Sequence, residues 1–190
     1  MSNIAIFASG NGTNAENIIT HFKNHPKHHV TLVCSNKNSA GVLDKAKKHH
    51  IQTFVFNKKD LYESDSILDT LKKHHIDFIV LAGFLWLMPD NITSTYHRKI
   101  INIHPALLPK YGGKGMYGMN VHRAVIEAND KKSGITIHWV NEKYDDGDVI
   151  FQATCDIEPE DTDISLADKV HQLEYRHFPV IIEQLLDQQS

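Results

Sequence analysis

The first hundred positions of the chain alternate between two spacings of apolar residues. Helix spacing, with apolar side chains three or four positions apart, occurs at 13–23, 41–48 and 60–73. Short β-rich apolar runs occur at 3–9, 30–35, 53–56, 77–82 and 99–104. Strands that alternate with helices predict βαβ units, and therefore a mostly parallel sheet with helices on both faces.

The last third of the chain has a different pattern. Strand-like runs at 134–140 and 148–157 are separated by a segment with an Asp-Gly turn signal, which predicts a C-terminal antiparallel hairpin. A closing helical region follows, with Asp163 or Ser165 as its expected N-cap and Pro179 as an expected kink or break. Because no linker divides the chain, we expect a single α/β domain with a Rossmann-like fold.

Composition narrows the class of protein. Of the 190 residues, 41% are hydrophobic and 23% are charged, and the formal net charge is −3. This balance gives no sign of a nucleic-acid partner. The N-terminal residues lack the basic region of a signal peptide, and no apolar run is long enough to span a membrane. We therefore expect a cytoplasmic monomer or homodimer that acts on small molecules, with no nucleic-acid or membrane partner.

Cysteine and histidine bear on redox and metal chemistry. Cys34 and Cys155 lie in strand-like runs far apart, which predicts two buried free thiols in a reducing compartment. Six of the fourteen histidines lie in adjacent pairs, and KKHH occurs at both 47–50 and 72–75, where it ends a predicted helix. Because no His or Cys motif has metal-ligand spacing, we expect no metal site.

A glycine turn, GNGTN at 10–14, follows the first predicted strand and opens the first predicted helix. Its two glycines allow the backbone to turn sharply and to approach a ligand closely. The free N–H groups at a helix start suit an anion such as phosphate. The third glycine of a dinucleotide fingerprint is missing, so a phosphate site and a plain strand-to-helix turn are both open.

The stretch INIHPALLPKY, at 101–111, ends a predicted buried strand with two polar side chains. Asn102 and His104 are two positions apart, so they point to the same face of the sheet. The carboxyl end of a parallel strand is where such sheets bind ligands. An Asn can donate to a developing oxyanion and a His can move a proton, which favours chemistry over a simple strand end.

An orienting carboxylate usually accompanies a proton-shuttling His. The predicted hairpin turn YDDGD offers Asp145, Asp146 and Asp148. A solvated acidic turn is the alternative, since the sequence alone does not bring this turn to His104.

These stretches carry a resemblance to a known family. INIHPALLPKY resembles the N-x-H-P-[SA]-L-L-P signature of the folate-dependent formyltransferases. SGNGTN resembles the phosphate loop of the family branch that acts on glycinamide ribonucleotide. LAGFLWLMP, at 81–89, resembles the folate-pocket loop, and VNEKYDDGDVI resembles the catalytic acidic loop. The match covers essentially the whole chain in the right order, and it implies the single-domain formyltransferase fold.

The resemblance implies an activity and a division of labour. The formyl group of 10-formyltetrahydrofolate, a co-substrate, would pass to the amine of glycinamide ribonucleotide in purine biosynthesis, without a metal. Residues 1–100 would form the phosphate-binding half, and residues 100–190 the catalytic and folate-binding half. Asn102 and protonated His104 would stabilise the tetrahedral oxyanion, while Asp145 would hold the imidazolium charge and assist proton transfer.

The resemblance also implies two sets of binding residues. Substrate-binding residues would be Gly10, Asn11, Gly12, Thr13, Asn14, His171 and Glu174. Folate-binding residues would be Lys59, Leu85, Trp86, Leu87, Met88, Asn141, Glu142, Lys143 and Tyr144.

Three features depart from the family pattern. Trp86 stands where many members carry Arg, and Asp148 replaces a common Pro. The segment 112–124 is longer and richer in glycine than usual, so we expect a flap in which Lys114 can reach an anion.

Two related enzymes share part of this signature, and a third alternative comes from another class of protein. Formyltetrahydrofolate deformylase carries an N-terminal regulatory domain, and methionyl-tRNA formyltransferase adds a C-terminal tRNA-binding domain. Because this chain begins at its first predicted strand and shows no such addition, we expect neither. A nucleotide-binding module without catalysis would not need Asn102, His104 and Asp145 together.

Overall fold

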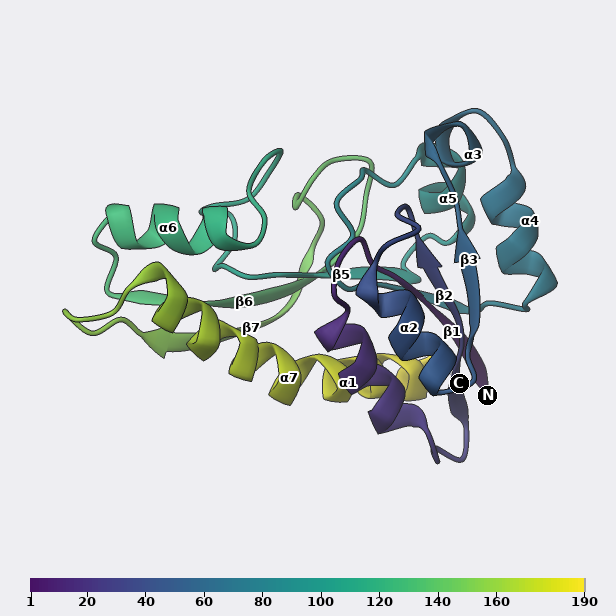
Figure 1. Cartoon of the computed structure of the whole chain (residues 1–190), viewed down its shortest axis with the longest axis horizontal. Helices are drawn as coiled ribbons and strands as arrows, with labels where there is room; N and C mark the ends of the chain where they lie inside the picture. Colours follow the sequence, from purple (N-terminus) through teal and green to yellow (C-terminus); the bar gives the residue numbers. More distant parts are fainter. Residues whose placement is uncertain (190) are drawn as a thin grey trace.

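The computed structural model describes residues 1–189, and within them seven strands form one sheet in the order β3-β2-β1-β4-β5-β6-β7 (Figure 1). β1 to β5 are parallel, whereas β6 and β7 add antiparallel pairs. The predicted mostly parallel sheet and the antiparallel C-terminal strands are therefore confirmed. The strands are β1 (Ser2–Phe7), β2 (His28–Ser35), β3 (Gln52–Val55), β4 (Phe78–Leu81), β5 (Ile100–His104), β6 (Lys132–Trp139) and β7 (Val149–Asp156).

Helices cover both faces of this sheet. Buried residues of α1, α2, α6 and α7 belong to one apolar cluster, and those of α3, α4 and α5 belong to another. The long α7 runs along β6 and β7 and returns to α1, which ties the two ends of the molecule together (Figure 1). The helices are α1 (Thr13–Phe22), α2 (Gly41–Lys48), α3 (Lys58–Tyr62), α4 (Ser66–Lys73), α5 (Asp90–Thr95), α6 (Met119–Glu127) and α7 (Asp163–Gln188).

The single helix predicted over 60–73 is wrong, because the segment forms the two helices α3 and α4. Asn57 and Asp60 form a capping box that starts α3 earlier than predicted. The Ser64 hydroxyl donates to the Asp60 carbonyl and accepts from the Ser66 N–H. These side-chain bonds offer the backbone an alternative to continuous helix, and the apolar spacing does not reveal them.

The closing helix α7 continues through Pro179 without a break. A proline cannot donate to the carbonyl four residues before it, here that of Tyr175. The Asn17 side chain on α1 donates to that carbonyl at 2.8 Å, so the freed acceptor is satisfied from a neighbouring helix. The N-cap is Thr162, which forms a capping box with Ser165, so the expected N-caps Asp163 and Ser165 were wrong.

Both KKHH segments lie at the ends of helices, as predicted. His50 and His75 follow α2 and α4 with left-handed φ angles of 59° and 49°. Cys34 is buried, but Cys155 is only half-buried, so the expectation of two buried thiols holds for Cys34 alone. Across residues 1–189, no group of three His, Cys, Asp or Glu side chains is arranged to hold a metal. No helix of that range has the length and apolar character needed to cross a membrane.

Candidate active site

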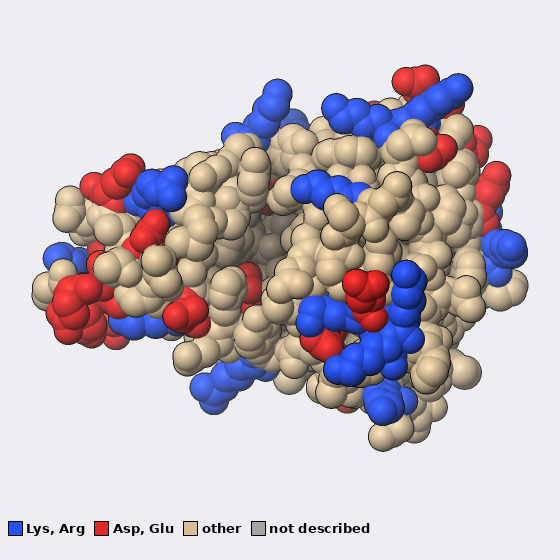
Figure 2. Space-filling model, viewed as in Figure 1, with Lys and Arg blue, Asp and Glu red and all other residues tan. Residues whose placement is uncertain are grey.

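A cavity of about 820 Å³ lies where β1, β4 and β5 end. Segments 10–14, 82–85 and 102–105, which follow or end these strands, form part of its wall. Figure 2 shows the surface hollowed between the two ends of the molecule. This is the edge at which parallel α/β sheets bind ligands.

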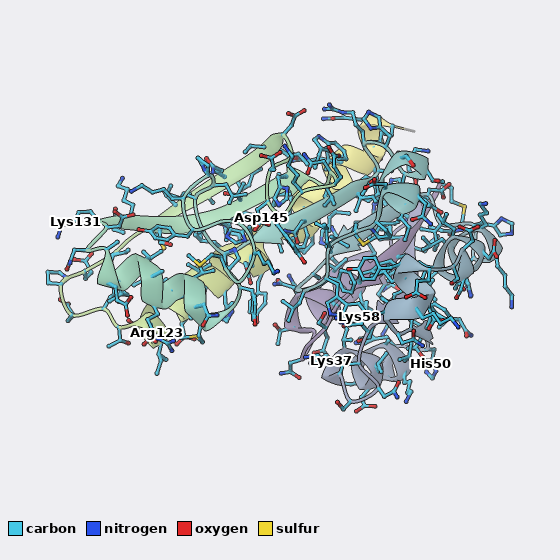
Figure 3. The ribbon with its side chains drawn as sticks, turned by 90° about the horizontal axis from the view of Figure 1, so that it is seen from above. Lys37, His50, Lys58, Arg123, Lys131 and Asp145 are labelled. Atoms are coloured by element: carbon cyan, nitrogen blue, oxygen red, sulfur yellow. The ribbon has the colours of Figure 1, made fainter. Side chains whose placement is uncertain are left out.

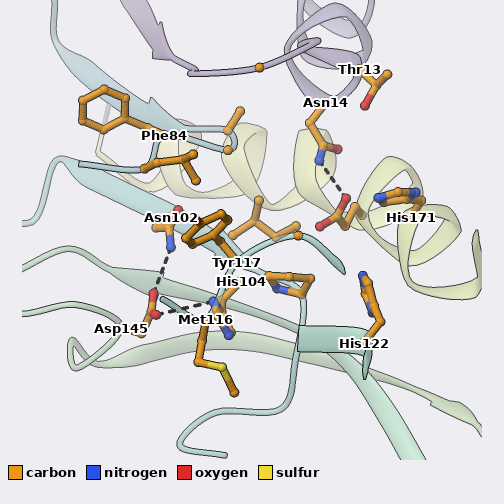
Figure 4. A pocket seen from close by; sticks show the side chains of 18 of the residues that line it. Thr13, Asn14, Phe84, Asn102, His104, Met116, Tyr117, His122, Asp145 and His171 are labelled. Carbon is orange, nitrogen blue, oxygen red and sulfur yellow. Dashed lines mark hydrogen bonds and ion pairs between the residues drawn. The ribbon is translucent and has the colours of Figure 1, made fainter. Parts of the chain in front are cut away.

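Asn102, His104 and Asp145 meet at the wall of this cavity (Figure 4). Asn102 Nδ2 donates to Asp145 Oδ1 at 3.3 Å, and His104 Nδ1 lies 3.5 Å from Asp145 Oδ2. The other two acidic candidates of the turn contact basic residues instead. Asp146 lies 3.7 Å from Lys143, and Asp148 lies 3.3 Å from Arg98.

His104 is held by a backbone carbonyl as well as by Asp145. Its Nε2 lies 2.7 Å from the carbonyl oxygen of Tyr111, which has a left-handed φ of 57°. A carbonyl can only accept a hydrogen bond, so Nε2 carries a hydrogen in every protonation state that keeps this contact. The proton that His104 gains or loses therefore sits on Nδ1, which faces Asp145.

Burial and charge act in opposite directions on these two residues. Burial lowers the pKa of His104 below its ordinary value, and the Asp145 charge and the Tyr111 carbonyl offset only part of this effect. Burial alone would raise the pKa of Asp145, but His138, His104 and the Gly113 N–H together hold it below its ordinary value. An ionised Asp145 beside a neutral His104 is an arrangement that can accept a proton and stabilise the resulting charge.

His138 is a part of the site that the sequence analysis did not single out. It lies opposite Asn102 in the antiparallel β5–β6 pair, and its Nε2 is 3.1 Å from Asn102 Nδ2 and 3.5 Å from Asp145 Oδ1. Its Nδ1 lies 2.8 Å from the carbonyl oxygen of Trp139. The sequence did offer one signal, since His138 is a polar residue in the apolar run GITIHWV. Its contact with Asn102 could not be predicted, because it depends on the register between β5 and β6.

The glycine turn lines the opposite side of the same cavity. Gly12 has a left-handed φ of 73°, and a Cβ there would lie 2.5 Å from the side chain of Val42. Only glycine fits that position, because both the backbone angle and the close approach of α2 exclude a side chain. The turn places the start of α1, with Thr13 and Asn14, toward the cavity (Figure 4).

The helix α7 supplies the two remaining substrate candidates. Glu174 is 6% exposed and accepts from Asn14 Nδ2 at 2.8 Å, and burial raises its pKa. His171 lines the cavity beside His122, whose pKa is lowered to about 4 by burial and then by His171 (Figure 4). Asn14 Oδ1 and His122 Nδ1 are buried without a hydrogen-bond partner in the described chain, so the cavity holds unused polar groups.

The residues expected to bind folate do not all lie in one place. Leu85 and Tyr144 line the large cavity. A smaller cavity of about 50 Å³ adjoins it and shares Asn102 and Asp145 with it. The expected folate residues that line this smaller cavity are Trp86, Leu87, Met88, Lys143 and Tyr144.

Three expected folate residues lie elsewhere. Among the described residues, Lys59, Asn141 and Glu142 line neither of these two cavities. Lys58, the neighbour of Lys59, lies over Trp86 instead, with its Nζ 5.8 Å from the centre of the Trp86 ring.

The glycine-rich segment after Tyr111 forms a wall of the cavity. Residues 113–118, which include Lys114, line it from the side of α6. The Gly113 N–H donates to Asp145 Oδ2 at 2.9 Å, and Met116 packs against the apolar core. The segment thus fixes Asp145 through a backbone contact that its glycine content did not reveal.

Together, the fold and the site define an α/β domain in which an amide, an imidazole and a carboxylate share one cavity with a glycine turn. The chain belongs to the formyl transferase family, which it matches over residues 2–182.

Named relatives and solved structures agree with this assignment. Phosphoribosylglycinamide formyltransferase of Bacillus subtilis is 38% identical over 193 residues, which cover 98% of this chain and 95% of that protein. The chloroplastic enzyme of that name from Arabidopsis thaliana is 35% identical over 94% of this chain, which spans only 63% of its length. The crystal structure of phosphoribosylglycinamide formyltransferase from Bacillus halodurans superposes with a TM-score of 0.88 at 36% identity, covering 99% of this chain and 97% of that one.

Proposed function

We propose that the protein transfers the formyl group of 10-formyltetrahydrofolate to the amine of glycinamide ribonucleotide in purine biosynthesis. The products are N-formylglycinamide ribonucleotide and tetrahydrofolate. The observation that carries the proposal is one cavity lined by Asn102, His104 and Asp145 on one side and by the glycine turn on the other. The names of the relatives support the choice of acceptor.

The residues divide into a binding part and a reacting part. The backbone N–H groups of the glycine turn hold the substrate phosphate at the start of α1. Glu174 and His171 on α7 bind the rest of the ribonucleotide. The apolar loop 85–88 and the turn that carries Tyr144 hold the pterin ring next to His104. This assigns phosphate binding mainly to residues 1–100, and catalysis and folate binding mainly to residues 100–190.

The reaction forms one C–N bond and breaks another. The substrate amine attacks the formyl carbon, and the Asn102 amide donates to the oxyanion that develops. His104 takes up the amine proton on Nδ1, where Asp145 stabilises the imidazolium. The bond to folate N10 then breaks, and the proton passes from His104 to N10. None of these reaction steps requires a redox change or a metal.

A turnover assay tests the proposal. Purified protein with both substrates should release tetrahydrofolate, followed by absorbance, and the release should depend on glycinamide ribonucleotide. Absence of turnover would contradict the proposed function. Turnover that persists without the ribonucleotide would identify a deformylase, in which water replaces the amine.

The role of the glycine turn has its own test. Glycinamide riboside, which lacks the phosphate, should show a KM raised by at least ~10-fold, because charge-assisted hydrogen bonds to the turn are lost. Equal KM values for the riboside and the ribonucleotide would show that residues 10–14 do not bind the phosphate.

A further inference from the structure

Three consecutive residues in the loop after β5 contact both members of the His104–Asp145 pair. The carbonyl oxygen of Tyr111 lies 2.7 Å from His104 Nε2, and the Gly113 N–H donates to Asp145 Oδ2 at 2.9 Å. A Cβ on Gly112, which lies between them in the chain, would be 3.3 Å from Asp145 Cβ. The backbone of this loop therefore sets how the histidine and the carboxylate are oriented.

Tyr111 makes its contact with His104 from a backbone conformation that side chains disfavour. Its φ of 57° lies in the left-handed region. A residue other than glycine keeps such a conformation only where the surrounding structure fixes it. The direction of the Tyr111 carbonyl therefore depends on the contacts that hold the rest of this residue in place.

The side chain of Tyr111 is held by an aspartate from a later part of the chain. The Tyr111 hydroxyl donates to Asp130 Oδ2 at 2.9 Å, and the ring packs against the apolar cluster that includes residues of α6 and α7. Asp130 lies between α6 and β6, next to Lys131, which Figure 3 shows at the far tip of the sheet, well away from Asp145. Tyr111 thus connects this end of the molecule to the proposed active site.

Lys110 helps to keep Asp130 charged and in position. Its Nζ donates to the two carboxylate oxygens of Asp130 at 3.2 Å and 3.1 Å. This contact, and after it the hydrogen bond from Tyr111, holds the pKa of Asp130 below its ordinary value. Because an ionised carboxylate is a stronger acceptor than a neutral one, the hydrogen bond from the Tyr111 hydroxyl is charge-assisted.

We propose that Asp130 and Tyr111 are positioning residues that orient His104 for proton transfer. Asp130 fixes the side chain of Tyr111, and Tyr111 directs its carbonyl to His104 Nε2, so that Nδ1 faces Asp145. Neither Asp130 nor Tyr111 lines the large cavity, so both act through His104 and not on the substrate. This inference rests on the role proposed above for His104 in formyl transfer.

NMR of the histidine ring nitrogens tests this orientation without any substrate. At a pH where His104 is neutral, its ¹⁵N signals in the parent protein should show a protonated Nε2 and an unprotonated Nδ1. Tyr111→Phe, which removes only the hydroxyl, and Asp130→Ala should each shift these signals toward a mixture of the two tautomers. The double variant should shift them no further than either single variant, because both changes break the same connection.

Steady-state kinetics of the proposed reaction provide a second measurement. Tyr111→Phe and Asp130→Ala should each lower kcat by ~10-fold, because a proton-transfer group that is out of position reacts less efficiently. The KM for glycinamide ribonucleotide should stay within about twofold of the parent value, since neither residue lines the cavity. A raised KM with unchanged kcat would indicate a role in binding and would contradict the proposal.

Two matched variants serve as controls. Tyr96→Phe removes a tyrosine hydroxyl that donates to the Ile76 carbonyl at 3.2 Å, and Tyr96 belongs to the other apolar cluster. Lys132→Ala removes an exposed lysine two positions after Asp130. Both variants should keep the parent tautomer of His104 and the parent kcat.

Two outcomes of the NMR measurement would overturn the proposal. One is a parent-like His104 tautomer in both Tyr111→Phe and Asp130→Ala. The other is an equal change in Tyr96→Phe, which would indicate a general loss of stability. Because the tautomer is measured without substrates, the two proposals fail separately: the expected tautomers in a protein without turnover would support the orientation of His104 and contradict formyl transfer.

Discussion

Asp145 is the residue at which the contacts of the site converge. Its Oδ1 accepts from Asn102 and lies near His138, and its Oδ2 accepts from the Gly113 N–H and lies near His104. A carboxylate has about four lone-pair sites, so these partners use its full capacity. Asp145 therefore fixes the relative positions of two strands, the acidic turn and the glycine-rich segment.

Alanine variants of the three reacting residues should lose turnover. Asn102→Ala, His104→Ala and Asp145→Ala are each expected to lower kcat by at least ~10², the usual contribution of oxyanion and proton-transfer groups. Steady-state kinetics of the proposed reaction measure this. Asp146→Ala is the control, because Asp146 contacts Lys143 and not His104. If Asp146→Ala lost turnover while Asp145→Ala kept near-normal turnover, the catalytic carboxylate would be Asp146 and not Asp145.

The pKa of His104 should respond to the charge of Asp145. The Asp145 carboxylate raises this pKa against the effect of burial, so Asp145→Asn should lower it further. The imidazole then protonates at a more acidic pH than in the parent protein. An NMR titration of the His104 ring measures the shift, with Asp146→Asn as the control. An unchanged or higher value would show that Asp145 does not act on His104.

At the scale of elements, the turn between β1 and α1 depends on Gly12 more than on Gly10. Gly12→Ala places a Cβ against Val42 with a left-handed φ, so we expect a loss of stability of ~1–3 kcal/mol. Gly10→Ala has open space around its Cβ and should fold with near-parent stability. Urea denaturation measures both. Equal losses in the two variants would contradict the packing of α2 on this turn.

Elements were predictable where local spacing decides them. The apolar spacing of 41–48 predicted α2 with its observed bounds, because that helix buries one regular face. The split between α3 and α4 was not predictable from apolar spacing, since hydrogen bonds of Asn57 and Ser64 override it. The passage of α7 through Pro179 depended on Asn17, which lies on another helix.

At the scale of the molecule, α7 makes the two halves of the chain one unit. It packs on α1, α6, β6 and β7, and its Glu174 is hydrogen-bonded to Asn14 across the cavity. The substrate candidates on α7 therefore depend on packing against the first half.

We expect the chain to unfold as one cooperative unit. Trp86 packs against one apolar cluster and Trp139 against the other, so each reports on a different face of the sheet. The variant Trp86→Phe leaves Trp139 as its single tryptophan, and Trp139→Phe leaves Trp86. In urea each variant should show one fluorescence transition, and the two transitions should have the same shape when each is plotted relative to its own midpoint. A second transition seen by only one tryptophan would show that the two halves unfold separately.

The sequence by itself determined the alternation of strands and helices, the glycine turn, and the common face of Asn102 and His104. These follow from spacing along the chain, which is local. The residue pattern left three carboxylates open and the family resemblance favoured Asp145, but only the tertiary structure placed Asp145 next to His104. It also placed His138 beside Asn102 and directed the Tyr111 carbonyl to His104. Those contacts depend on strand register and loop conformation, which are set by packing between distant segments and leave no local pattern.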